Sequence, residues 1–444
     1  MALAQPINES PLRLSPLRTV LIISDKSEDG LALGETLKTK SFTTITSILS
    51  GNNLSGIPRQ SPDAVLLYFS QESPRLKAIS NALRARYEAK NVPIIGIFGR
   101  DWQIDANIVD TVMYMPVHPA QIAHRINSMI RLTIMQTEIA MRMDTLREDF
   151  GIDYRLNPDS FGDRLRVLFI GKATPEFMII INALERKDVE VFAAFTSFTA
   201  FDFLHETSFD AVVMNALNGL EPGLTIAQTM KRNSNLYHTP ALLLGRRGQI
   251  ETDEAYQNGI SDILYNDSNE KDLQDRVLEL ARFHKLHRQV KLEFDNLGQA
   301  ECHDESGAYN LQFFSKHLSR LIDVYAAQDL PVSILTVEVD IDTRIAVEPL
   351  TRSLILNQVG SMIKNMVRVY DVTGRISQNV YSIAFPGQSS ASLDPVVKRI
   401  SALSKTSEFG PDPSGRLTYK IDLKIDSAEL GPGVTGESWL ANHI

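Results

Sequence analysis

The sequence predicts an α/β protein that begins with two doubly wound parallel sheets and continues into a domain of different layout. Its 444 residues are too many for one ordinary core and fit about three domains. Short apolar segments alternate with amphipathic helices twice along the chain, which favours parallel sheets covered by helices on both faces. From about residue 291 this alternation gives way to a pattern that contains a β-hairpin.

The composition is that of a globular protein, with 43% hydrophobic and 22% charged residues. A formal net charge of -9 argues against a protein that wraps nucleic acid or lies on an anionic membrane, because both need dense faces of Lys and Arg. Cys302 is the only cysteine, which excludes a disulfide framework and fits a reducing cytoplasm. We therefore expect a cytoplasmic protein with no nucleic-acid partner.

The N-terminal tail, residues 1–16, contains Pro6, Asn8, Glu9 and Pro11 where a signal peptide needs an unbroken apolar segment. No later apolar run has the length of a bilayer-spanning helix. We expect no membrane insertion.

The first domain is predicted over residues 17–150 and the second over 164–290, with 151–163 as a turn-rich linker. Strands are expected at 18–23, 64–69, 93–98 and 111–115, and again at 166–170, 211–214, 241–244 and 262–264. Long helices at 120–150 and 273–294 close the two domains. The second domain is therefore an internal repeat of the first, parallel in layout though weak in identity.

The runs Pro62-Asp63-Ala64-Val65-Leu66-Leu67 and Phe209-Asp210-Ala211-Val212-Val213-Met214 resemble the third-strand motif of response-regulator receiver domains, which have a flavodoxin-like fold. The resemblance implies an acceptor Asp after each run, but Tyr68 and Asn215 stand there. The acidic metal-binding pair of the family aligns with Ser24-Asp25 and Gly171-Lys172. We expect no phosphoacceptor in either domain, with Asp25 the one acidic residue retained.

Each long helix has two interpretations. It packs on its own sheet as the last helix of a receiver, or its extension serves dimerisation, since receiver folds commonly pair through their later elements. The second interpretation implies a homodimer through the receivers. His284 and His287 lie on one face of the helix at 273–294, but no third metal ligand of suitable spacing is visible, so we expect exposed histidines.

The third domain, 291–444, is organised around the stretch from Arg368 to Gly387. Its R-x-x-D-x-x-x-R pattern, with Arg368, Asp371 and Arg375, precedes a hairpin strand from Val380 that stops at Pro386-Gly387. This spacing resembles the GGDEF family of diguanylate cyclases, and the resemblance implies an α+β, nucleotidyl-cyclase-like domain. The family's signature itself is replaced by Ser377-Gln378-Asn379-Val380-Tyr381.

Diguanylate cyclases need carboxylates to hold Mg²⁺ while one GTP attacks another. The resemblance places Glu338 and Asp340 on the metal-binding strand, but Asn379 and Val380 occupy the signature's acidic positions. Asp342, Thr343 and Ala346 stand where the family has residues that read phosphate and guanine. We therefore expect no enzyme, no bound metal and no cofactor.

Arg368 and Asp371 stand where the family binds its product, cyclic di-GMP, at an inhibitory site, and Arg399 is the best candidate for a second arginine there. A guanidinium donates two hydrogen bonds to guanine O6 and N7, and a carboxylate accepts from N1 and N2. The alternative is an i,i+3 ion pair of a few tenths of a kcal/mol.

The whole layout resembles PleD-type response regulators, in which two receivers precede a GGDEF domain, and the losses resemble the degenerate, PopA-type members that act as cyclic di-GMP receptors. We expect a receptor that couples this effector to protein partners of bacterial signalling or cell-cycle control, with recruitment to a cell pole. The alternatives are a residual diguanylate cyclase and a ligand-independent scaffold.

Overall fold

The computed structural model describes residues 18–48, 57–99, 102, 104–105, 107–154, 164–233, 235–297, 302–341, 347–410, 418–431 and 433–441. The predicted tail and residues 155–163 of the predicted linker lie outside these ranges. Apart from the tail, the chain divides by its internal contacts into two units, one with 17–133 and 157–289 and the other with 134–156 and 290–444. Within the described ranges, no helix is both long and apolar enough to cross a membrane.

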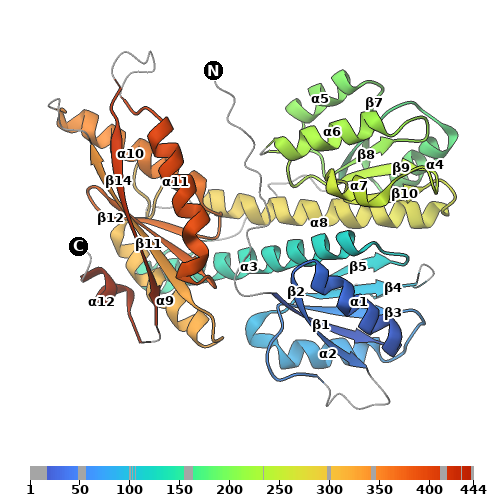
Figure 1. Ribbon diagram of the computed structural model, residues 1–444, viewed down its shortest axis with the longest axis horizontal. Coiled ribbons are helices and arrows are strands. Elements are labelled where there is room, and N and C mark those ends of the chain that lie inside the picture. Colours follow the sequence, from blue (N-terminus) through green and yellow to red (C-terminus); the bar gives the residue numbers. More distant parts are fainter. Residues whose placement is uncertain are drawn as a thin grey trace. The chain divides into compact units, whose positions relative to one another are not determined.

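The first sheet is five-stranded and parallel, with the strand order β2-β1-β3-β4-β5 of a doubly wound fold (Figure 1). Its strands are β1 (Arg18–Ser24), β2 (Phe42–Ile48), β3 (Ala64–Phe69), β4 (Ile94–Phe98) and β5 (Thr111–Tyr114), and its helices are α1 (Ser27–Thr39), α2 (Leu76–Arg86) and the first half of α3 (Pro119–Phe150). The central strands β1, β3 and β4 are almost wholly buried, which is why they read as continuous apolar runs.

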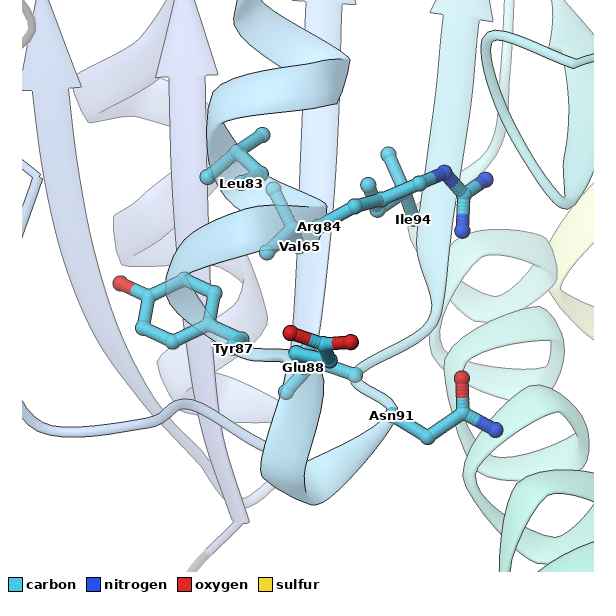
Figure 2. A pocket seen from close by; sticks show the side chains of 8 residues that line it. Val65, Leu83, Arg84, Tyr87, Glu88, Asn91 and Ile94 are labelled. Atoms are coloured by element: carbon cyan, nitrogen blue, oxygen red, sulfur yellow. The ribbon is translucent and has the colours of Figure 1, made fainter.

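A small pocket of about 150 Å³ lies at the amino ends of β3 and β4, beside Val65 and Ile94 (Figure 2). Two of its polar groups are engaged, because Arg84 pairs with Asp110 at 2.9 Å and the Tyr87 hydroxyl donates to a backbone carbonyl. Open parallel sheets bind ligands at the opposite edge, where the strands end. We assign this pocket no function.

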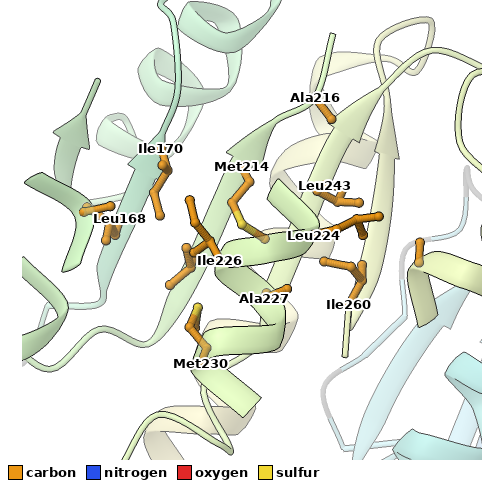
Figure 3. Packing of buried hydrophobic residues seen from close by; sticks show 14 of the residues in the cluster. Leu168, Ile170, Met214, Ala216, Leu224, Ile226, Ala227, Met230, Leu243 and Ile260 are labelled. Atoms are coloured by element: carbon orange, nitrogen blue, oxygen red, sulfur yellow. The ribbon is translucent and has the colours of Figure 1, made fainter. Parts of the chain in front are cut away.

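The second sheet repeats the first, with five parallel strands in the order β10-β9-β8-β6-β7. Its strands are β6 (Arg166–Ile170), β7 (Glu190–Ala194), β8 (Ala211–Asn215), β9 (Ala241–Gly245) and β10 (Asp262–Tyr265), and its helices are α4 (Pro175–Glu185), α5 (Ser197–Glu206), α6 (Glu221–Arg232), α7 (Thr252–Gln257) and α8 (Glu270–Leu297). Alternate strand residues build separate cores on the two faces. Leu168 and Met214 face α6 on one side (Figure 3), and Leu273 and Val277 of α8 cover the other.

The two sheets belong to one unit and meet through α8. The Glu279 carboxylate accepts hydrogen bonds from the Thr111 hydroxyl at 2.9 Å and from the Val112 amide at 3.1 Å. Farther along, the Arg125 guanidinium of α3 lies 5.5 Å from the centre of the Phe283 ring. Helix α8 therefore packs on its own sheet and also contacts β5 and α3 of the first domain.

Arg276, a largely buried charged residue of α8, also connects this helix to the first domain. Its guanidinium pairs with Asp262 at 3.0 Å and with Asp272 at 3.2 Å, and it donates to the carbonyl of Tyr114 at 3.1 Å. This edge of the first domain is thus covered from within the chain. The homodimer stays a prediction.

The third sheet has four antiparallel strands in the order β12-β13-β11-β14. These are β11 (Val332–Ile341), β12 (Val372–Ser377), β13 (Val380–Pro386) and β14 (Ile421–Leu430), accompanied by α9 (Leu311–Ala326), α10 (Pro349–Met366), α11 (Asp394–Thr406) and α12 (Gly436–Ala441). Strand, helix, hairpin, helix and strand follow one another as in a split βαβ domain. The predicted fold class, two doubly wound domains followed by an α+β domain, is confirmed.

Candidate functional site

The acceptor position of the first receiver-like domain carries Tyr68 at the end of β3. Burial raises the pKa of Tyr68, and the nearby carboxylates of Asp29 and Asp25 raise it further. Asp25 accepts hydrogen bonds from the amides of Ser70 and Gln71 at 3.1 and 3.2 Å, so its carboxylate holds the loop after β3. A hydroxyl with a raised pKa stays neutral, which supplies no carboxylate for phosphoryl transfer at this position.

The acceptor position of the second domain carries Asn215 at the end of β8. Its amide donates to the carbonyl of Lys172 at 2.6 Å and to the Thr174 hydroxyl at 3.3 Å, and its oxygen accepts from the Leu217 amide at 3.1 Å. The donors and the acceptor of the side chain are all used, and they tie the loop after β6 to the loop after β8. Asn215 therefore has a clear structural role.

The residues at the expected catalytic positions come together at one end of the third sheet. Glu338 is paired with Val380 across the strands and lies 3.7 Å from the Lys424 ammonium. The Asn379 amide group donates to the carbonyl of Val339 at 3.1 Å, which ties it to β11. Asp340 has an exposed side chain on the same strand, and Asp342, Thr343 and Ala346 lie outside the described residues.

The R-x-x-D turn joins α10 to β12. The Asp371 amide donates to the carbonyl of Arg368 at 3.0 Å, and the Asp371 Oδ2 accepts from the Arg368 amide at 2.8 Å. These reciprocal bonds close the turn and fold the carboxylate back onto its own main chain. The Arg368 guanidinium is half-buried and lies 5.6 Å from the centre of the Tyr370 ring.

The Asp371 carboxylate faces the interior. It is 6% exposed, and among the described residues its Oδ1 has no hydrogen-bond partner. Burial raises the pKa of Asp371 to about 6, even though the Arg368 guanidinium and amide favour the ionised form. Near neutral pH this carboxylate is charged but poorly compensated, which leaves it able to accept further hydrogen bonds.

Arg399 projects from α11 toward the same turn. Its guanidinium donates through Nη2 to the carbonyl of Met366, the last residue of α10 and two positions before Arg368. The structure therefore brings Arg368 and Asp371, from the turn between α10 and β12, close to Arg399 of α11. The sequence resemblance grouped these residues as a ligand site, and that role stays a prediction.

A buried polar cluster lies beneath the turn, and it was not foreseen from the sequence. Glu138 on the second half of α3 is 1% exposed; its Oε1 accepts from the Arg142 Nε at 2.7 Å and from the His317 Nε2 at 3.0 Å. Burial opposes ionisation of Glu138, but Arg142 and His317 outweigh it and hold the pKa of Glu138 below its usual range. Thr145, about two turns after Glu138 on α3, contacts the His317 Nδ1 at 2.9 Å.

Arg142 connects this cluster to the main chain of the turn. Its Nη2 donates to the carbonyls of Val369 and Asp371, each at 3.4 Å, while Nη1 reaches the Tyr309 hydroxyl at 3.5 Å. The guanidinium also lies 4.8 Å from the centre of the Phe294 ring. The available signal was the i,i+4 placement of Glu138 and Arg142 on an otherwise apolar part of α3.

The expectation of exposed histidines on α8 is wrong. His284 is 6% and His287 is 9% exposed, because this helix is covered on more than one side. The His287 ring lies 5.0 Å from the ring of His238, between centroids. Burial lowers the pKa of His284 to about 3, so this side chain is neutral at physiological pH.

Comparisons with solved structures found likenesses to parts of this chain. A response regulator from Thermotoga maritima is 20% identical over 27% of this chain and 98% of its own, with a TM-score of 0.24. The FimX GGDEF domain from Pseudomonas aeruginosa is 16% identical over 32% of this chain and 88% of its own, with a TM-score of 0.29.

The GGDEF domain of DgcB from Caulobacter crescentus, in complex with c-di-GMP, is 16% identical over 32% of this chain and 84% of its own, also with a TM-score of 0.29. No family model matches the chain, and no curated protein is significantly similar to it.

Proposed function

We propose that the protein is a cyclic di-GMP-binding signalling receptor, without diguanylate cyclase activity, that couples the dinucleotide to protein partners. The observation that carries this proposal is the convergence of Arg368, Asp371 and Arg399 at one turn. The Arg368 guanidinium would donate to O6 and N7 of one guanine, and the Asp371 carboxylate would accept from N1 and N2. Arg399 would stack on or pair with the ligand.

The proposal that catalysis is lost rests on the residues at the expected catalytic positions of the third sheet. A cyclase needs acidic groups to hold Mg²⁺ against the triphosphate. Here the Asn379 amide is tied to the neighbouring strand and Val380 is apolar. Glu338 faces the Lys424 ammonium, which competes with a metal ion for the carboxylate.

The two receiver-like domains would serve as docking surfaces rather than as phosphorylation switches. Tyr68 and Asn215 supply no acceptor carboxylate, and the loops that follow their strands are held by internal hydrogen bonds. This proposal includes a homodimer, a partner protein in bacterial cell-cycle signalling and recruitment to a cell pole.

A ligand-independent scaffold is the rival with an observation in its favour. Asp371 is turned inward and already caps its own turn, so the motif has a structural role without any ligand. A scaffold would bind its partner equally well with and without the dinucleotide.

Calorimetric titration of cyclic di-GMP tests the proposal. We expect micromolar binding to the full chain and loss of binding in Arg368→Ala, with no heat from GTP. Arg352→Ala is the matched control, because Arg352 lies near the start of α10, about 20 Å along the helix from its last turn. Equal binding by Arg368→Ala, or no binding by any form, contradicts the proposal.

Incubation with GTP and Mg²⁺, followed by chromatography, tests the catalytic part separately. We expect no cyclic di-GMP. Product formed by the wild type and lost in Glu338→Ala would show a residual cyclase and overturn the assignment of Asn379 as a disabling replacement.

A further inference from the structure

We propose that the second half of α3 restrains the R-x-x-D turn in its closed form, so that docking of this helix and engagement of a ligand by Asp371 oppose each other. The inference rests on the proposed function, because it concerns the same turn. It assigns a regulatory role to Arg142, a residue that touches the turn only through main-chain carbonyls.

The contacts of Arg142 come from within one unit of the chain, residues 134–156 and 290–444. Arg142 is buried, and its Nη2 holds the carbonyls of Val369 and Asp371 from below at 3.4 Å. Glu138 and the Phe294 ring fix the orientation of the guanidinium. The contacts that restrain the turn therefore come from Arg142 on α3, and they do not involve the side chain of Arg368.

The closed turn is poorly suited to a ligand that approaches from solvent. The Asp371 carboxylate is 6% exposed, and its Oδ2 is occupied by the Arg368 amide. An outside guanine can reach this carboxylate only if the turn opens or the side chain rotates outward. Opening the turn moves the two carbonyls that Arg142 holds, because residues 369 and 371 belong to the turn. Rotating the side chain breaks the Oδ2 bond to the Arg368 amide, which is one of the two bonds that close the turn.

Linkage makes this effect reciprocal. If α3 docking weakens ligand binding, ligand binding must weaken α3 docking by the same factor. We therefore expect the dinucleotide to loosen the second half of α3 on the third domain. The loosening of this helix would then transmit ligand binding from the turn to the rest of the protein.

The test uses the full chain with Glu138→Gln and Arg142→Met combined. The double variant removes the restraint without leaving a buried charge unpaired, since both side chains become neutral at similar volume. We expect it to bind cyclic di-GMP about fivefold more tightly than the wild type. The two long hydrogen bonds that are lost are together worth about 1 kcal/mol, which corresponds to this change in the dissociation constant. Amide hydrogen exchange of residues 134–150 should become faster when the wild type binds ligand.

Arg147→Ala is the matched control, because Arg147 lies on the same helix with its side chain 60% exposed and pairs with Asp144. It should leave the affinity unchanged. If the wild type binds and the double variant binds equally or more weakly, or if exchange in α3 slows with ligand, this inference alone is overturned. If neither form binds, the proposed function fails and the inference fails with it.

Discussion

Dinucleotide binding should weaken as the pH falls from 7 to 5, because Asp371 must be ionised to accept hydrogen bonds from guanine. Burial raises the pKa of Asp371 to about 6. With that value, about nine-tenths of the free protein carries the carboxylate at pH 7 and about one-tenth at pH 5. The affinity should therefore fall about tenfold over this range. The guanines and phosphates of the ligand keep their charge, so the effect belongs to the protein.

The measurement is the dissociation constant of cyclic di-GMP at pH 7, 6 and 5 at constant ionic strength. Asp371→Asn is the control for this titration. It removes the ionisable group and keeps an oxygen for the Arg368 amide, so its weaker binding should not change with pH. A wild-type affinity that is constant, or that rises toward pH 5, would refute the assignment of the Asp371 carboxylate as a ligand acceptor.

Three further results are expected. The folded-state pKa of Asp371 lies above its ordinary value of 3.8, so its contribution to stability is full below pH 4 and is lost as the pH rises through 6. Asp371→Asn should therefore gain up to about 3 kcal/mol over the wild type at pH 7.5 and almost none at pH 4, measured by hydrogen exchange in β12. Glu138→Ala should lower the stability of the third domain by about 3 to 5 kcal/mol in urea unfolding, because it strands the buried Arg142, whereas a cost below about 1 kcal/mol would contradict the pairing. Acetyl phosphate with Mg²⁺ should add no mass to the intact protein, because positions 68 and 215 carry Tyr and Asn, and a phosphorylated product would mean that a side chain at another position accepts phosphate.

The central strands could be predicted closely from the sequence. The third strand of the first sheet was expected at 64–69 and is Ala64–Phe69, because a parallel strand buried on both faces leaves an uninterrupted apolar run. The edge strands β2 and β7 were missed for the opposite reason. Phe42–Ile48 contains several threonines and Glu190–Ala194 is mostly part-exposed, so neither has a strong apolar pattern.

The candidate site could be predicted only in part. Arg368 and Asp371 lie three positions apart and just before the hairpin, and this local placement distinguishes them from Arg320 and Asp323, which have the same spacing. The cluster beneath them depends on contacts between Glu138 and His317, which are 179 residues apart. Periodicity predicted that α3 would be long, but it carried no information about which domain its second half contacts.

The central claim is that the turn at Arg368 to Asp371 binds cyclic di-GMP. The most direct measurement is a crystal structure of the full chain grown with the dinucleotide at saturating concentration. The account predicts a guanine whose O6 and N7 accept hydrogen bonds from the Arg368 guanidinium, with the Asp371 carboxylate turned outward to its N1 and N2. A dinucleotide bound elsewhere, or a turn still closed with Asp371 on the Arg368 amide, would contradict it.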